Sequence, residues 1–247
     1  MKRTVTLLIV LIMISALLTG CGHKHTTGNW SVDLERHWKT CSECGKETKK
    51  GKHELDSTGV CEKCGSEFST FDDGSVFITT YNKQGDYNGM YTYSPDGSLK
   101  LDMYSEYEYA EDGTRLSSKT YVNGALTEEN TYRPNPDDPA NPLVAESTSH
   151  YSDGAREHKV FDEMGNLTSS IYYEADGTVS SDESFEHVYD EKGQFLNIKM
   201  YTNGILFCEN DYDYRDDGTT YICKVVYYNE DGTVDTENYY NEDGSEK

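Results

Sequence analysis

From residue 72 onward, this chain repeats itself at an interval of 80 residues. Residues 72–132 align without a gap with residues 152–212, and the matches fall mainly on glycine and tyrosine. The aligned pairs include Gly74 and Gly154, Tyr93 and Tyr173, Tyr109 and Tyr189, Gly113 and Gly193, Lys119 and Lys199, Tyr121 and Tyr201, Glu129 and Glu209, and Tyr132 and Tyr212. So many coincidences at one interval indicate an internal duplication. The copies cover about 72–151 and 152–229, with a partial copy over 230–247.

Turn sequences divide each copy into short segments. The turn glycines lie 11 to 16 residues apart, and most follow an acidic residue, as in Ser94-Pro95-Asp96-Gly97. Asp-Gly suits a type I turn with a G1 bulge, and Asn-Gly at Asn123 and Asn203 suits a type I′ hairpin. Between the turns, polar and apolar residues tend to alternate, which is the strand period. The sequence therefore predicts a mainly β fold, an extended antiparallel array of β-hairpin repeats over 71–247, with each unit stacking on its neighbours.

The composition of the repeat region limits its core and its partners. Residues 69–247 contain 12 basic and 37 acidic residues, and only 28 of these 179 positions are Leu, Ile, Val or Phe. Such a composition is typical of disorder, but all 21 tyrosines lie at or after Tyr81 and can replace the aliphatic core. The acidity argues against nucleic acid as a partner. Tyrosine also makes good binding surfaces, and the candidates for a binding face are Tyr93, Tyr109, Tyr121, Tyr173, Tyr189, Tyr201 and Tyr212.

The Tyr-x-x-x-Gly units, such as Tyr189-Asp-Glu-Lys-Gly193 and Tyr228-Asn-Glu-Asp-Gly232, resemble the YD repeats of Rhs-type proteins and MORN-variant repeats. That resemblance covers about residues 72–247 and implies extended β structures that enclose cargo or bind other proteins. The region is also similar to the aromatic hairpin repeats of cell-wall-binding proteins. Those repeats rely on tryptophan, which this region lacks.

Two C-x₂-C pairs, Cys41 with Cys44 and Cys61 with Cys64, precede the repeats, and each is followed by glycine. This spacing matches the template for zinc, which four thiolates bind as a closed tetrahedral, structural site. Outside the cell, two disulfides are the alternative. The segment His37-Trp-Lys-Thr-Cys41 carries a resemblance to zinc-ribbon modules of bacterial surface proteins, which implies the four cysteines as ligands and places His37 and His53 as packing groups.

The N-terminus has the pattern of a secretory signal. Lys2 and Arg3 precede an apolar run from Val5 to Leu18, which is too short to cross a bilayer as a helix. Leu18-Thr-Gly-Cys21 resembles the lipobox of bacterial lipoproteins, which implies diacylation of Cys21 and anchoring to the extracytoplasmic side of a bacterial membrane. The expected organisation is a signal peptide over 1–20, a tether over 21–30, a zinc-ribbon-like module over 31–68 and the repeat domain over 71–247.

The remaining signals leave two questions open. Cys208 and Cys223 flank a turn and are either a disulfide or two free thiols. The acidic turns lack the spacing of a calcium-binding loop, and turn chemistry explains them better. Because no catalytic motif occurs, the expected function is binding or display, with a protein or cell-surface ligand and a structural zinc ion. The alternatives are a cell-wall or carbohydrate binder and an enzyme with an unrecognised active site.

Overall fold

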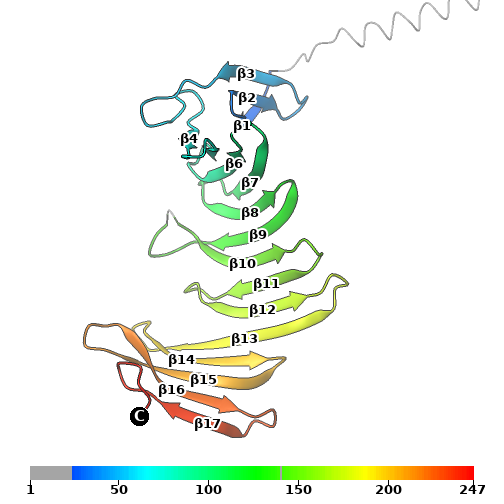
Figure 1. Ribbon diagram of the computed structural model, residues 1–247. Coiled ribbons are helices and arrows are strands. Elements are labelled where there is room, and N and C mark those ends of the chain that lie inside the picture. The colour runs from blue at the N-terminus through cyan, green and yellow to red at the C-terminus, as the bar shows by residue number, and fades with distance from the viewer. Residues whose placement is uncertain (1–23, 140) are drawn as a thin grey trace, which may run out of the picture. The chain divides into compact units, whose positions relative to one another are not determined.

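The computed structural model describes residues 24–139 and 141–247. This part of the chain is all β, with no helix (Figure 1). Its strands form a three-stranded sheet of order β1-β2-β3 and a 14-stranded sheet in which β4 to β17 follow one another in chain order. Where strand pairing is resolved, each strand is antiparallel to its neighbour, as in β8 with β9. The predicted fold class is therefore confirmed.

The chain divides into two compact units, with the division after Asp102. The strands that begin in the first unit are β1 (Thr27–Val32), β2 (Arg36–Cys41), β3 (Glu47–Lys52), β4 (Glu67–Thr70), β5 (Val76–Tyr81), β6 (Tyr87–Tyr93) and β7 (Leu99–Tyr109). The strands of the second unit are β8 (Arg115–Val122), β9 (Ala125–Arg133), β10 (Leu143–His150), β11 (Arg156–Phe161), β12 (Leu167–Tyr173), β13 (Val179–Tyr189), β14 (Phe195–Thr202), β15 (Ile205–Tyr214), β16 (Thr220–Tyr228) and β17 (Val234–Tyr239).

The core of the first unit joins the cysteine segment to the first repeat strands. Val32 of β1, Ile78 of β5 and Tyr93 of β6 are buried together, and Ile78 is fully inaccessible to solvent. Cys64 and Phe68 pack against this cluster. The boundary expected between residues 68 and 71 therefore marks a change in sequence pattern. Residues on both sides of it contribute to the same buried cluster.

The duplication is visible in the register of the second unit. The pairing of β7 with β8 runs from Met103 opposite Val122 to Tyr109 opposite Arg115. The pairing of β13 with β14 repeats it with every number raised by 80, from Glu183 opposite Thr202 to Tyr189 opposite Phe195. Even the register shift before the terminal tyrosine recurs, so the duplicated sequence has duplicated the β-bulge.

The hairpin turns have the predicted chemistry. Thirteen glycines between residues 69 and 247 have positive φ, and they are the glycines expected at turns. At the two Asn-Gly turns the asparagine is left-handed as well, with φ of 50° at Asn123 and 52° at Asn203, as a type I′ turn requires. In the Asp-Gly turns the aspartate accepts the backbone N–H two residues on; Asp96 Oδ1 and Ser98 N, for example, are 2.9 Å apart.

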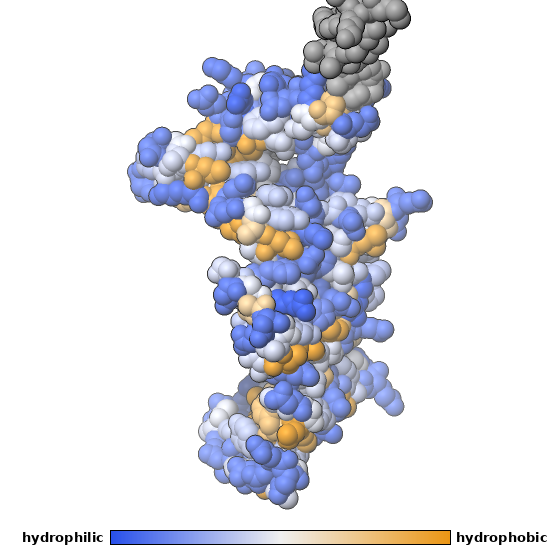
Figure 2. All heavy atoms as spheres, turned by 90° about the vertical axis from the view of Figure 1, so that its right-hand side faces the viewer, coloured by the Kyte–Doolittle hydropathy of each residue, from blue (hydrophilic) through white to orange (hydrophobic). Residues whose placement is uncertain are grey.

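Apolar residues on the surface are dispersed. Figure 2 shows a mostly hydrophilic face on which hydrophobic residues form small, separate patches. Few residues are deeply buried, and in the second unit the buried hydrophobic side chains among the described residues are Ala155, Cys208, Val225 and Val226. This agrees with a thin sheet that has little aliphatic core.

Candidate functional site

The two C-x₂-C-G segments form matching backbone turns. In the first, Gly45 N donates to Cys41 O at 2.9 Å, and in the second, Gly65 N donates to Cys61 O at 2.8 Å. Both glycines are left-handed, with φ of 69° and 72°. This is the conformation that the sequence predicts for glycine after each pair, because it lets the backbone turn tightly around the sulfurs.

The second turn belongs to a group of two cysteines and two histidines. One ligand atom from each of His37, His53, Cys61 and Cys64 lies within 4.8 Å of the others. Cys61 Sγ is 3.8 Å from His37 Nδ1, and Cys64 Sγ is 3.7 Å from His53 Nδ1. Ligands of a tetrahedral zinc ion, at ~2.3 Å for sulfur and ~2.0 Å for nitrogen, are separated by about 3.3 to 3.8 Å. These two contacts therefore have the separation that zinc ligands need.

The hydrogen bond on the other side of His53 also suits a ligand. His53 Nε2 is 3.0 Å from the carbonyl oxygen of Asp33. Because a carbonyl only accepts hydrogen bonds, Nε2 carries the proton and Nδ1 presents its lone pair toward Cys64. Metal-binding histidines are commonly oriented by such a bond to a carbonyl. His37 is buried, and its ring is held 4.9 Å from that of Trp30.

The two cysteines of this group differ in acidity. Burial opposes ionisation of Cys61, but hydrogen bonds from backbone groups, that of Cys64 foremost, outweigh it and lower the pKa of this thiol to about 6. Burial raises the pKa of Cys64, and repulsion from Cys61 adds to that rise. A metal ion removes this repulsion by taking up both thiolates.

The first turn belongs to a separate group, His25, Cys41 and Cys44, whose ligand atoms also lie within 4.8 Å of one another. The four cysteines predicted to share one site are thus divided between two groups, and each group adds histidine. The reason lies in β2. His37 is near its start and Cys41 at its end, so at ~3.3 Å per residue they are about 13 Å apart along the strand.

For His37 and His53 the sequence predicted packing instead of ligation. The signal for His37 and His53 was their position beside and between the C-x₂-C pairs, but only strand pairing shows which cysteines they meet. β3 runs antiparallel to β2 and places Gly51 opposite His37. His53 follows directly after β3, and its ring centroid lies 5.2 Å from that of His37.

A second candidate site lies on one face of strands β8 to β12, which we call the polar face. Glu129 is its centre, because its carboxylate contacts Lys119 Nζ at 2.9 Å and His150 Nε2 at 3.0 Å. The hydrogen bond from Lys119 and that from His150 lower the pKa of Glu129. The guanidinium carbon of Arg156 lies 4.5 Å from the ring centre of Tyr173. The polar face consists of Lys119, Glu129, Thr131, Glu146, Thr148, His150, Arg156, His158 and Tyr173, which the strand registers place on one side of the sheet.

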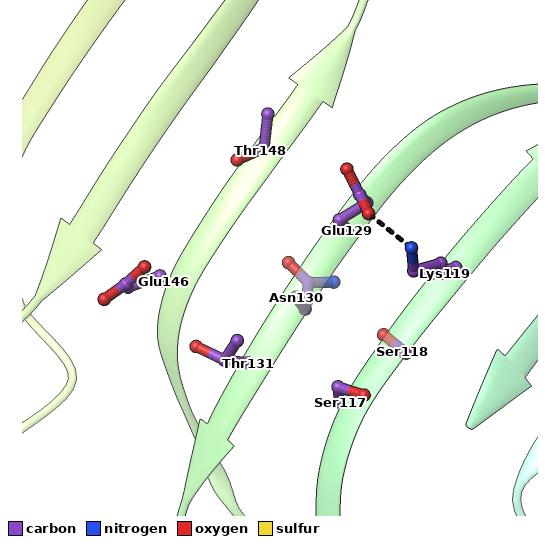
Figure 3. Close-up of a pocket in the computed structure, with 8 residues that line it drawn as sticks. All are labelled: Ser117, Ser118, Lys119, Glu129, Asn130, Thr131, Glu146 and Thr148. Atoms are coloured by element: carbon purple, nitrogen blue, oxygen red, sulfur yellow. Dashed lines mark ion pairs between the residues drawn. The ribbon is translucent and has the colours of Figure 1, made fainter. Parts of the chain in front are cut away.

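Two shallow hollows adjoin on the polar face. One, of about 260 Å³, is lined from Ser117 on β8 to Thr148 on β10, and Figure 3 shows Glu129 and Lys119 paired across it. The other, of about 250 Å³, is lined from Glu129 to Tyr173, and both hollows include Glu129 and Thr148. The residues that line them are polar or charged, and the charges are of both signs. Pockets for small molecules are larger, about 300–1,000 Å³, and mostly apolar.

The seven tyrosines expected to form a binding face do not share one surface. Tyr121, Tyr173 and Tyr201 lie on the same side of the sheet as the polar face, as the registers show. Tyr189 and Tyr212 lie on the opposite side, where both rings contact Phe195. Tyr109 belongs to that opposite side as well, because its register in β7 points it away from the face of Lys119, and its ring lies 6.1 Å from that of Tyr107. Tyr93 is buried in the first unit. Most of these rings therefore pack against neighbours.

Cys208 and Cys223 are free thiols. Cys208 lies opposite Tyr227, which is four positions along β16 from Cys223. Cys223 falls at a register shift, and its Sγ is 3.4 Å from Asp211 O. The disulfide alternative is therefore wrong for this register. Cys21 lies outside the described residues. Among residues 24–139 and 141–247, no helix is long and apolar enough to span a membrane.

Comparison with known proteins gives matches among solved structures but none by sequence. No protein-family model matches the sequence, and no curated protein matches it. Among solved structures, the chain is similar to one described as "Crystal Structure of TcdB2-TccC3-Cdc42", with 11% identity and a TM-score of 0.37 over 87% of this chain. It is also similar to "Crystal Structure of TcdB2-TccC3-TEV", with 12% identity and a TM-score of 0.21 over 86% of this chain. The matches span 14% and 13% of those chains.

Proposed function

We propose that this protein is a non-catalytic binding module, anchored by lipid at Cys21 outside a bacterial membrane, with a zinc-stabilised N-terminal unit. The observation that carries the binding role is the polar face, where charged side chains of both signs gather around adjoining hollows. Lys119, Glu129, His150 and Arg156 converge there from four strands. Mixed charges of this kind give a partner electrostatic complementarity and fix its orientation.

The second copy does not reproduce this arrangement. At the positions equivalent to Ser117 and Glu129 it has Asn197 and Glu209, and Asn197 Nδ2 donates to Glu209 Oε1 at 2.9 Å. Glu209 Oε2 also accepts from Tyr228 at 2.8 Å. The carboxylate is thus engaged by neutral groups instead of by a histidine, so the proposed binding site occurs once in the repeat array.

A protein ligand fits this surface better than a sugar. Carbohydrate sites commonly present an exposed aromatic ring, but the Tyr173 ring already carries the Arg156 guanidinium against it. Charged side chains around shallow hollows suit an extended, polar protein contact. Carbohydrate binding remains the alternative, and an enzyme is the less favoured third reading.

Paired variants on the two sides of the sheet test the binding site. Lys119→Ala and Arg156→Ala should each weaken capture of surface proteins of the producing bacterium by about fivefold or more, equivalent to about 1 kcal/mol. Lys159→Ala is the matched control, because Lys159 pairs with Glu157 at 2.8 Å on the opposite side of the sheet. Equal binding by all three variants would contradict the site. Capture of isolated glycans in place of proteins would support the carbohydrate alternative.

The zinc assignment rests on the closed Cys61, Cys64, His37 and His53 group. Four ligands complete a tetrahedron and leave no position for substrate, which is typical of structural zinc. Cys61→Ser should lose one metal ion per chain and lower the melting temperature of the first unit, measured by metal analysis and thermal unfolding. Cys223→Ser, a thiol outside both metal groups, should keep the full metal content. Metal content unaffected by Cys61→Ser would refute this assignment.

Lipid anchoring has its own test. The wild-type chain should partition into membranes in the producing bacterium, and Cys21→Ser should release it into the soluble fraction, because two acyl chains supply the binding energy. A soluble wild-type protein, or a membrane-bound variant, would refute the anchor.

A further inference from the structure

Strands β2 and β3 form a hairpin whose charge is opposite to that of the chain as a whole. Residues 36–52, which we call the basic hairpin, contain six basic and two acidic residues, a net charge of +4, whereas the chain carries −23. The lysines of β3 and of the turn before it are all exposed, and they are Lys46, Lys49, Lys50 and Lys52. The basic hairpin therefore presents a cationic surface on an acidic protein.

One side of the basic hairpin faces away from the closed metal group. His37 is buried, so its neighbours on β2, Arg36 and Trp38, lie on the opposite side of the strand, which we call the outer side. Lys52 lies opposite Arg36 and shares that side, and Lys50, two residues earlier on β3, does so by alternation. The outer side thus combines a tryptophan with three cations.

The carboxylates near these cations hold them only weakly. Arg36 Nε contacts Asp33 at 3.1 Å, and Lys50 pairs with Glu47. Both cations are more than half exposed, and ion pairs in such positions contribute little to stability. The guanidinium carbon of Arg36 also lies 5.7 Å from the ring centre of Trp38, so charge and aromatic ring are adjacent. The cations can therefore exchange a carboxylate for another anion at little cost.

The basic hairpin belongs to the unit nearest to Cys21. The first described residue, Lys24, follows Cys21 by three positions, and an extended chain spans at most ~3.6 Å per residue, which limits their separation to about 11 Å. Acyl chains on Cys21 would hold this unit at the surface of the bilayer. An anionic bilayer attracts the basic hairpin and repels residues 69–247, which contain 37 acidic and 12 basic residues.

We propose that the outer side of the basic hairpin docks on anionic phospholipid headgroups. Arg36, Lys50 and Lys52 bind headgroup phosphates, and Trp38 enters the interfacial layer, where tryptophan is enriched in membrane proteins. This proposal rests on the proposed lipid anchor at Cys21, because the anchor brings the hairpin to the surface. The acyl chains supply the attachment, and the hairpin sets the orientation of the first unit.

Tryptophan fluorescence tests the docking, because Trp30 and Trp38 are the two tryptophans of the chain. Protein purified from the producing bacterium is reconstituted in vesicles of phosphatidylcholine with or without phosphatidylglycerol, and brominated acyl chains in both serve as quenchers. Quenching should be stronger in the anionic vesicles, and it should fall in about 1 M salt, where the Debye length is about 3 Å. Trp38→Phe should remove the difference between the two vesicles, which assigns it to the outer side.

Paired lysine variants identify the surface that docks. Lys50→Gln combined with Lys52→Gln should lower the ratio of docked to undocked protein about 25-fold, because each lysine near an anionic surface contributes a factor of about five. Lys100→Gln combined with Lys192→Gln is the matched control, since both lysines are exposed, lie outside the hairpin and remove the same charge. Equal quenching of the wild type in both vesicles would overturn the docking. So would a hairpin variant that keeps wild-type quenching but loses capture of an acidic protein.

Sedimentation with the vesicles separates this proposal from the lipid anchor. Protein that sediments with both kinds of vesicle and is quenched equally in both has the anchor without the docking surface. Protein that sediments with the anionic vesicles alone has the docking surface without the anchor. Protein that sediments with neither has neither.

Discussion

At the scale of residues, the closed metal group depends on a close fit between His37 and Gly51. The two face each other across β2 and β3. A Cβ atom at position 51 would lie 2.9 Å from His37 Nε2, closer than ordinary van der Waals contact. The His37 ring has little room to retreat, because it is buried and packed at 4.9 Å against Trp30. Glycine at position 51 therefore keeps His37 oriented toward Cys61.

Gly51→Ala should consequently weaken metal binding without removing a ligand. We expect a loss of affinity of about 10- to 100-fold, the range found when groups that orient metal ligands are altered. Competition with a chelator of known affinity would measure it. Gly28→Ala on β1 is the matched control, because a Cβ atom there meets nothing within 4 Å and should leave the affinity unchanged. Equal affinities in both variants would show that the His37 ring adapts.

The same site shows what the sequence could predict at this scale. The C-x₂-C-G spacing identified both turns and the metal chemistry, because these depend on residues adjacent in sequence. It did not predict how the cysteines divide, because Cys61 and His37 are 24 residues apart and meet only through packing of the first unit. A regular tetrad of cysteines was therefore a reasonable expectation and the wrong grouping for this structure.

At the scale of elements, the Asp-Gly turns recur with nearly the same hydrogen bonds. At five turns, the aspartate accepts from both the amide and the hydroxyl of a Ser or Thr that follows the glycine. For Asp176, the hydroxyl of Thr178 is at 2.7 Å and its amide at 2.9 Å. These bonds to the hydroxyl and the amide favour the ionised carboxylate and lower its pKa from the ordinary value of 3.8. The other four pairs are Asp96 with Ser98, Asp217 with Thr219, Asp231 with Thr233, and Asp243 with Ser245.

The repeat array should therefore lose stability in acid. Because the folded-state pKa values of these aspartates lie below 3.8, their stabilisation is complete above that pH and disappears as the pH falls through the folded values. Urea unfolding at a series of pH values measures how much stability each protein loses in acid. The loss should be largest for the wild type and smaller for Thr178→Val. It should be smallest for Asp176→Asn, because the asparagine accepts the same hydrogen bonds without titrating. Identical pH profiles for the three proteins would contradict this account.

The β-bulges mark the limit of prediction for the strands. Alternation along 205–214 predicts that one face is shared by Leu206, Cys208, Tyr212 and Tyr214. The register shifts in β15 so that Leu206 lies opposite Tyr201 while Cys208 lies opposite Met200. Leu206 is thereby moved to the other face. Turns were predictable because glycine and asparagine determine them locally, but a bulge depends on the partner strand.

At the scale of the whole molecule, stability should be local. Both metal groups and the buried cluster of Val32, Ile78 and Tyr93 lie within the first unit. In the second unit, strands pair in chain order, from β8 with β9 to β16 with β17. In an array whose units contact only their neighbours, the free energy of unfolding is a sum of contributions from single repeats and from the interfaces between adjacent repeats. Long arrays of this kind no longer unfold in one all-or-none transition.

Metal removal should accordingly unfold one unit and spare the other. When a strong chelator strips the full chain, we expect amide hydrogen exchange to accelerate across 24–102, because Cys64 packs against the buried cluster and a metal site contributes folding free energy directly. Strands from β8 to β17 should keep their protection, since their backbone hydrogen bonds go to neighbouring strands and their residues ligate no metal in either group. Mass spectrometry of peptides after exchange resolves the two regions. The chelated Cys61→Ser variant provides the control for direct effects of the chelator, because of the two metal groups it retains only that of His25, Cys41 and Cys44. If amide exchange accelerated uniformly throughout the chain, the two units would unfold as one. If the amides of 24–102 kept their protection, the buried apolar cluster would stabilise the first unit without metal.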